Sequence, residues 1–405
     1  MQIKKTINQL LTTNNIVFFI FCFTLLFGVF LSFQLRFDYA DEMAAAALGI
    51  VCFWHIRKNP KLLLQPVIIS VSAIFIFYTA YSFIVQSNVP QAILQDLLVS
   101  LKPFVGFFGV FLLVPALSGF QRKIIRYLCI IFAIACAAIA SYSGGLLTGN
   151  YLSMWAFSGS LINFYLTIAV IAIVYLFSSD FDGKSFIVFF CMLAVGILTA
   201  RFKLFVLIAI ALSLYISRVH KNKIKINLKS ALAALAIAAV VVAVAYPKIN
   251  YYFINPNPKF PARQVLYSES FRLAEAHFPF GTGFASFGSF ASTKYLAPVY
   301  VENNLFEILN LESAKGNYAT DTFFACLLGQ FGVAGILAFF GFFVWIFKRS
   351  RREFSPEKQY FTLLIIGFFL SESFTNSTFT QSFGLIVMMI LGYILSEQKE
   401  KIAEI

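Results

Sequence analysis

A series of long apolar stretches constrains this chain more than any other feature of its sequence. A transmembrane helix needs about 20 apolar residues, and somewhat fewer where neighbouring helices bury it. We therefore expect an all-α polytopic membrane protein with about 12 transmembrane helices. The predicted spans are residues 16–33, 42–54, 62–85, 92–117, 124–142, 159–178, 186–200, 202–217, 231–247, 322–347, 360–374 and 380–396.

The composition excludes a set of soluble domains. Of the 405 residues, 60% are hydrophobic and only 12% are charged, about half the charged fraction of a soluble protein. A net charge of +13 would suit a nucleic-acid-binding protein, but the cations are spread over separate loops and form no single basic face. The expected partner is the lipid bilayer, with no nucleic acid. All six cysteines fall in or beside apolar runs, so no disulfide framework is expected.

The distribution of Lys and Arg predicts the orientation of the chain. Most of these cations fall in alternate connections, beginning with the N-terminal segment, and cytoplasmic loops are the ones enriched in positive charge. Both termini are therefore expected in the cytoplasm. Three regions follow: a membrane bundle at 1–247, a loop subdomain at 248–320 on the outer side, and a second membrane bundle at 321–405.

The outer loop contains the segment that we expect to be central to function. Its residues 262–278 have apolar positions at helical spacing, and a glycine-rich turn follows. At 100° per residue, Arg263 and His277 lie within about 40° of each other, whereas Arg263 and Arg272 face opposite ways. The glycines, including Gly281 and Gly283, would let backbone amides approach an anion.

A second basic site interrupts the apolar residues 186–217. Arg201 and Lys203 fall where two short spans turn at the outer surface. Ionisable side chains at such a position favour a functional role, because burial in the bilayer costs about 2.5–3.5 kcal/mol. The alternative is a pair of cations that snorkel at the end of a span.

Other charged groups remain open between function and structure. Lys102, followed by Pro103, falls near the middle of a span and either serves a site there or snorkels outward. The cluster of Asp38, Asp41 and Glu42 could supply a catalytic carboxylate from the first outer loop. Asp180 and Asp182 form an acidic pair typical of metal-binding transferases, but a solvated cytoplasmic turn is the better interpretation.

Known nucleotide and metal motifs are absent. GTGFASFG has Ser286 where a dinucleotide fingerprint requires glycine, and no parallel-strand unit surrounds it. No grouping of His, Cys and carboxylates has the spacing of a transition-metal site, and no G-x-S-x-G hydrolase motif occurs. We therefore expect neither a cofactor nor a metal.

Several segments together resemble the O-antigen polymerase and O-antigen ligase superfamily of bacterial envelope enzymes. They are, in order, LTARFK, ARQVLY, HFPFGTGFASFGSF, YLAPVY and YATDTFFACLLGQFGVAG, within residues 198–335. The resemblance implies a GT-C-like glycosyltransferase bundle in the bacterial inner membrane, with the active site on the periplasmic face. The donor would be an oligosaccharide linked to undecaprenyl pyrophosphate.

The resemblance also implies roles for particular residues. Arg201 and Arg263 match the family's pyrophosphate-binding arginines, with Ala200 in place of a usual serine, and Arg272 and Gly283 match a further Arg-Gly spacing. Asp321 stands where ligases carry a His-Asn pair, which favours a polymerase. The full candidate set is Asp321, His277 or Glu275 as catalytic base, Arg201, Arg263, Arg272 and Lys203 on the pyrophosphate, and Tyr295, Tyr300, Gly281 and Gly283 on the glycan.

The expected function is therefore polymerisation of O-antigen or a related capsular polysaccharide. This would be an inverting, metal-independent transfer of a glycan from undecaprenyl pyrophosphate onto another lipid-linked repeat unit, with a polysaccharide co-polymerase as a further partner. Two alternatives remain: a ligase that transfers glycan to the lipid A core, and a flippase for lipid-linked oligosaccharide. A flippase is less favoured because the charge is concentrated at one outer face, away from the midplane.

Overall fold

In the computed structural model, helices are the only regular secondary structure among the described residues. The structure describes residues 12–35, 37, 39–142, 161–179, 181–197, 201–219, 246, 250, 262–309, 311, 318–353 and 355–396. Helices make up 83% of these residues, and none of them forms a strand. Five helices in these ranges are long and apolar enough to cross a membrane, and four shorter ones are also apolar. The all-α membrane-protein class is confirmed at this level, and the number of crossings stays a prediction.

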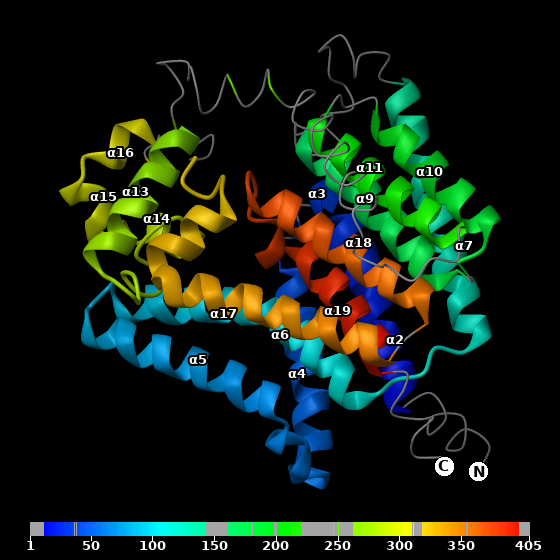
Figure 1. The fold of residues 1–405 in the computed structure, drawn as a ribbon, viewed down its shortest axis with the longest axis horizontal. Helices are drawn as coiled ribbons and strands as arrows, with labels where there is room; N and C mark the ends of the chain where they lie inside the picture. The colour runs from blue at the N-terminus through cyan, green and yellow to red at the C-terminus, as the bar shows by residue number, and fades with distance from the viewer. Residues whose placement is uncertain are drawn as a thin grey trace.

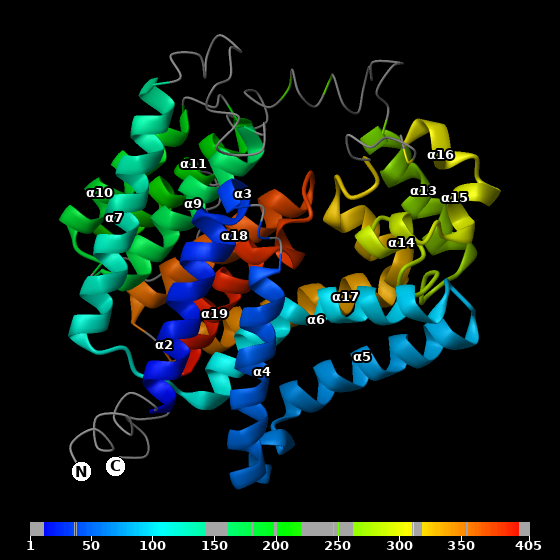
Figure 2. The same ribbon diagram turned by 180° about the vertical axis from the view of Figure 1, so that it is seen from behind.

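Helices lie over each predicted span except 231–247, of which only Tyr246 is described. Figures 1 and 2 show them from opposite sides. The helices are α2 Thr13–Phe23, η1 Thr24–Phe30, α3 Ser32–Leu35, α4 Ala40–Lys58, η2 Pro60–Leu64, α5 Pro66–Ile84, α6 Pro90–Leu113, α7 Gly119–Tyr142, α9 Leu161–Ser178, α10 Gly183–Ile197, α11 Phe202–Val219, α13 Ala262–Ala276, α14 Phe290–Lys294, α15 Pro298–Glu302, α16 Leu305–Ile308, α17 Phe323–Glu353, α18 Pro356–Ser373, η4 Thr378–Thr380 and α19 Ser382–Ser396.

Among the described helices, α6 and α19 have the most extensive contact with each other. Every residue of α19 after Ser382 is buried, and glycines allow the two backbones to approach. A Cβ atom added to Gly392 would lie 2.6 Å from the carbonyl oxygen of Phe107, and one added to Gly106 would lie 2.7 Å from Leu385. Small residues serve this purpose in membrane bundles, where close van der Waals contact replaces the hydrophobic driving force.

Changing Gly392 to alanine is expected to lower the free energy of unfolding by about 1–3 kcal/mol, as overpacking of a filled core does. The backbone of Phe107 cannot move aside as a flexible side chain would. Gly341→Ala is the matched control, because a Cβ atom there meets nothing within 4 Å. Thermal unfolding in detergent would compare the two, and equal melting temperatures would contradict this account of the α6 and α19 contact.

The segment 262–309 forms a small subdomain at one end of α5, α6 and α17 (Figures 1 and 2). Its core contains Leu266, Phe287, Tyr300 and Leu309, all fully buried. The predicted helix at 262–278 is observed as α13, and it packs against α17. The segment 262–309, which is more polar than the predicted spans around it, is therefore a folded subdomain at one end of the helix bundle.

The glycine-rich turn docks into a break in α17. Gly332 has φ +60° and ψ −161°, which interrupts the helix and leaves carbonyl groups of the preceding turn without helical partners. The amide nitrogen of Thr282 donates to the carbonyl of Gly329 at 3.0 Å, and that of Gly283 donates to Gln330 at 2.7 Å. The turn thus satisfies backbone groups that an apolar environment would otherwise leave unpaired.

Candidate functional site

The N-terminal end of α13 carries the first candidate cation to the start of α17. The guanidinium of Arg263 lies 3.6 Å from the carboxylate of Asp321, two residues before α17. The arginine side chain is 16% exposed and the aspartate 36% exposed. An arginine and a carboxylate from segments 58 positions apart in the sequence thus form a partly accessible pair.

Two more cations lie at the start of α11: Arg201 just before the helix, and Lys203 in its first turn. Lys203 donates to the carboxylate of Glu372 at 2.8 Å, and the charges of both Arg263 and Arg201 are close enough to act on Lys203. The start of α13 and the start of α11 therefore lie near each other. We call Arg201, Lys203, Arg263 and Asp321 the basic cluster.

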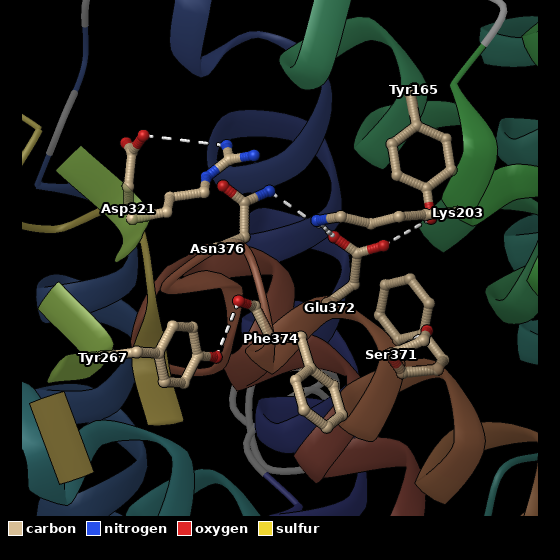
Figure 3. Close-up of polar contacts among 10 residues, drawn as sticks. Tyr165, Lys203, Tyr267, Asp321, Ser371, Glu372, Phe374 and Asn376 are labelled. Atoms are coloured by element: carbon tan, nitrogen blue, oxygen red, sulfur yellow. Dashed lines mark hydrogen bonds and ion pairs between the residues drawn. The ribbon is translucent and has the colours of Figure 1, made fainter. Parts of the chain in front are cut away.

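The buried carboxylate of Glu372 holds Lys203 of this cluster in place. Its side chain is 1% exposed, and the hydroxyl of Tyr165 donates to its second oxygen at 2.5 Å. Figure 3 shows Lys203 and Tyr165 converging on the carboxylate, with Asn376 beside Lys203. An ion pair removed from water needs such additional hydrogen bonds to offset its desolvation.

Sequence reasoning missed Glu372, although a signal was available. It is an acidic residue inside the predicted span 360–374, and ionisable residues within spans mark functional or paired positions. Tyr267 was also missed. Its hydroxyl donates to the carbonyl of Phe374 at 2.8 Å, which ties α13 to the end of α18 one turn after Arg263 (Figure 3).

Three candidates lie at the opposite end of α13 from Arg263. At 1.5 Å per residue, Arg272, Glu275 and His277 are about 14, 18 and 21 Å farther along the axis. Arg272 is 49% exposed and donates to Glu269 and to Asn303 of the subdomain. The angular proximity of Arg263 and His277 therefore does not bring them together. Arg272, the sequence candidate for the pyrophosphate site, and Glu275 and His277, the candidates for the base, are thus separated from the pair of Arg263 and Asp321.

The glycan-binding candidates also have structural positions. Gly281 and Gly283 have φ values of +72° and +90°, and their amide groups donate to His277 and Gln330 within the docked turn. Those amides are thus already engaged and are not arranged around an anion. Tyr300 is 0% exposed and hydrogen-bonds to Gly288 and Ser292, so it belongs to the subdomain core. Tyr295 is half-buried beneath the ammonium of Lys294.

A cavity of about 680 Å³ lies next to the basic cluster. Its walls come from α4, α5, α6, α17 and α19, together with the loop subdomain. Lys102 projects into it and donates to Asp41 at 2.5 Å and to Glu42 at 2.7 Å. Lys102 is therefore paired inside the bundle, and its two partners, which the sequence predicts in the first outer loop, lie in the first turn of α4. Asp38 and Asp180 lie outside the described residues.

The cavity and the basic cluster share one wall. Thr320 and Ser377 line the cavity, and the hydroxyl of Ser377 donates to the carbonyl of Thr320 at 2.7 Å. Each has a neighbour on the cluster side: Asp321 follows Thr320, and Asn376, which precedes Ser377, donates to Glu372 at 3.4 Å. A ligand that extends from the cavity past Thr320 and Ser377 would contact both the cavity and the basic cluster.

Burial raises the pKa of the Asp321 carboxyl above its ordinary value, although the charges of Arg263 and Lys203 lower it. The net upward direction makes this carboxylate a better proton acceptor than an exposed aspartate. Among the described residues, no three His, Cys, Asp or Glu side chains are grouped to hold a metal ion. Arg263 and Lys203 near the carboxylate of Asp321 are groups that can bind an anion and accept a proton.

The chain was compared with protein-family models and with curated proteins. Neither comparison finds a match.

Proposed function

We propose that this protein is a membrane glycosyltransferase that polymerises a bacterial surface polysaccharide, of the O-antigen or capsular kind. The donor would be a glycan on undecaprenyl pyrophosphate, and the acceptor would be another lipid-linked repeat unit. One observation supports this above the others: Arg263 lies 3.6 Å from the partly accessible carboxylate of Asp321, and Lys203, from a distant segment, is close enough for the charges of Arg263 and Arg201 to act on it.

The cations would stabilise the leaving group. When the glycosidic bond breaks, negative charge develops on the pyrophosphate, and guanidinium groups match phosphate oxygens with paired hydrogen bonds. A partly dehydrated site strengthens this interaction, because less water competes for the charge. Lys203 is held by Glu372 and would therefore act mainly by its position and charge.

Asp321 would accept the proton of the attacking hydroxyl group. The sugar hydroxyl forms a bond to the anomeric carbon, the pyrophosphate leaves with the bonding electrons, and the carboxylate takes the proton. Attack from the face opposite the leaving group inverts the anomeric centre. Asp321 stays the base in this proposal because Glu275 and His277 lie at the far end of α13.

The proposal includes the finer topology that the sequence predicts. About 12 spans would place the α10 to α11 turn and the segment 248–320 on the same, periplasmic side of the inner membrane, with both termini in the cytoplasm. The basic cluster would then face the compartment in which lipid-linked repeats are polymerised. Fusions of alkaline phosphatase after Lys294 and after Glu397 test this arrangement, with activity expected only in the first.

The rate of transfer is expected to increase with pH along an acidic limb whose midpoint lies above 3.8, the ordinary value for an aspartate. Only the ionised carboxylate can accept the proton, and its pKa is raised by burial. Asp321→Glu should retain such a limb, whereas Asp321→Asn should remove the activity. A pH profile of the initial rate checks this, and an active Asp321→Asn variant would exclude Asp321 as the base.

The decisive experiment uses the purified full-length protein and lipid-linked repeat units extracted from a strain that lacks its gene. Appearance of longer lipid-linked chains supports the proposal. Transfer to lipid A core would instead identify a ligase, and translocation without new glycosidic bonds would identify a flippase. Gel separation of the labelled glycans distinguishes the first two outcomes, and protection of the glycan inside sealed vesicles distinguishes the third.

A further inference from the structure

We infer that the cavity lined by Lys102, Asp41 and Glu42 binds the uncharged sugar residues of the acceptor, as a site separate from the basic cluster. This inference rests on the proposed function, because it names the second substrate's position. The cavity has a volume of about 680 Å³, which lies within the range of roughly 300–1,000 Å³ that small-molecule sites occupy.

The charges of the cavity exclude a second phosphate site. Among the described residues that line it, the Asp, Glu, Lys and Arg side chains are three acids and two bases: Asp41, Glu42, Asp96, Lys102 and Lys294. An anion would therefore meet an excess of negative charge. The pyrophosphate belongs with the basic cluster, and a neutral, hydroxyl-bearing ligand suits the cavity.

The polar groups of the cavity suit hydroxyl groups in particular. A carboxylate can accept about four hydrogen bonds, and the hydrogen bonds from Lys102 use one oxygen each of Asp41 and Glu42. Lys102 holds both acids in place, since its ammonium contacts the two together. The sugar hydroxyls would donate to the remaining acceptor positions of these carboxylates.

An unsatisfied hydroxyl group independently indicates a missing polar ligand. Ser32 lines the cavity, is only 8% exposed, and its Oγ has no hydrogen-bond partner among the described residues. Burying a hydroxyl without a partner costs free energy, so such groups are usually paired with protein, water or ligand. A sugar hydroxyl in the cavity would complete this group.

The position of the cavity fits an acceptor. Thr320 and Ser377 line it, and Asp321, the residue after Thr320, belongs to the basic cluster. A saccharide held by Asp41 and Glu42 would extend toward Asp321, where its terminal hydroxyl meets the donor. The aromatic rings of Phe290 and Phe75, which also line the cavity, would cover the apolar faces of the sugar rings.

The test separates saccharide binding from catalysis. Lipid-linked units that accumulate when the gene is deleted are cleaved with mild acid, and the released oligosaccharide is tritium-labelled by reduction. Its binding to the full-length protein in lipid nanodiscs is measured by equilibrium dialysis. Glu42→Gln is expected to weaken binding roughly 10- to 100-fold, the loss of a hydrogen bond to a charged group. Ser100→Trp, which fills the cavity from α6, should abolish it.

One variant is expected to bind the oligosaccharide like the wild type. Glu302→Gln makes the same chemical change at an exposed carboxylate outside the cavity. Unchanged binding in both Glu42→Gln and Ser100→Trp would overturn the inference, as would displacement of a bound polyprenol by Ser100→Trp without loss of oligosaccharide binding. If the deletion strain accumulates no lipid-linked saccharide, the proposed function itself fails.

Discussion

Replacing Arg263 with alanine is expected to reduce chain lengthening by at least about 100-fold, with the protein still folded. Removing one preorganised donor from a site of developing negative charge costs about 10²–10³ in rate, and an arginine that stabilises phosphoryl charge contributes about 10³–10⁵. Arg263 lies beside Asp321 at 3.6 Å. Initial rates of lengthening with extracted lipid-linked repeats measure the effect.

The matched control is Arg272→Ala, on the same helix. Arg272 lies about 14 Å from Arg263 along the α13 axis and contacts Glu269 and Asn303. We expect it to retain near wild-type activity. The order of effects is the discriminating result: if Arg272→Ala loses activity and Arg263→Ala does not, the basic cluster is not the donor site.

Arg201→Ala is expected to have an effect similar to that of Arg263→Ala, and the double variant should be little worse than either single one. Residues that act on one leaving group show strongly non-additive losses. The Arg263→Lys variant should be faster than Arg263→Ala but slower than the wild type, because lysine supplies the charge but not the paired hydrogen bonds of guanidinium. Fully multiplicative losses would indicate two independent sites.

Replacing Glu372 with leucine is expected to lower the free energy of unfolding by about 3–5 kcal/mol, the usual cost of removing one partner of a buried ion pair. The carboxylate is 1% exposed, and both Lys203 and Tyr165 donate to it. Its loss would leave an unpaired ammonium and an unpaired hydroxyl in an apolar place. Thermal unfolding in detergent, followed by tryptophan fluorescence, measures the change.

The control for this effect is the double variant Glu372→Leu with Lys203→Met. Replacing a whole buried pair by apolar residues is often close to neutral, because no charge remains unpaired. The double variant should therefore be more stable than Glu372→Leu alone. A Glu372→Leu protein with the wild-type melting temperature would show that the pair does not hold α11 to α18.

The sequence alone determined the helical elements and the faces of α13. Apolar run length and helical spacing are local properties, and they predicted α13 and the opposite orientations of Arg263 and Arg272. The same spacing misled for His277, because an angle around the axis says nothing of the distance along it. The sequence also identified the hairpin cations Arg201 and Lys203, because charged residues within an apolar run can be recognised without a structure.

Only the tertiary structure decided which charges meet. Lys102 could have snorkelled, and Glu372 was hidden in an apolar run, but packing of α4 on α6 and of α11 on α18 brings each to an opposite charge. The glycine turn looked like an anion cradle, yet its amides fill the break in α17 at Gly332. Local sequence fixes which groups a segment carries. Burial then forces each polar group to find a partner, and that partner depends on which segments the fold places side by side.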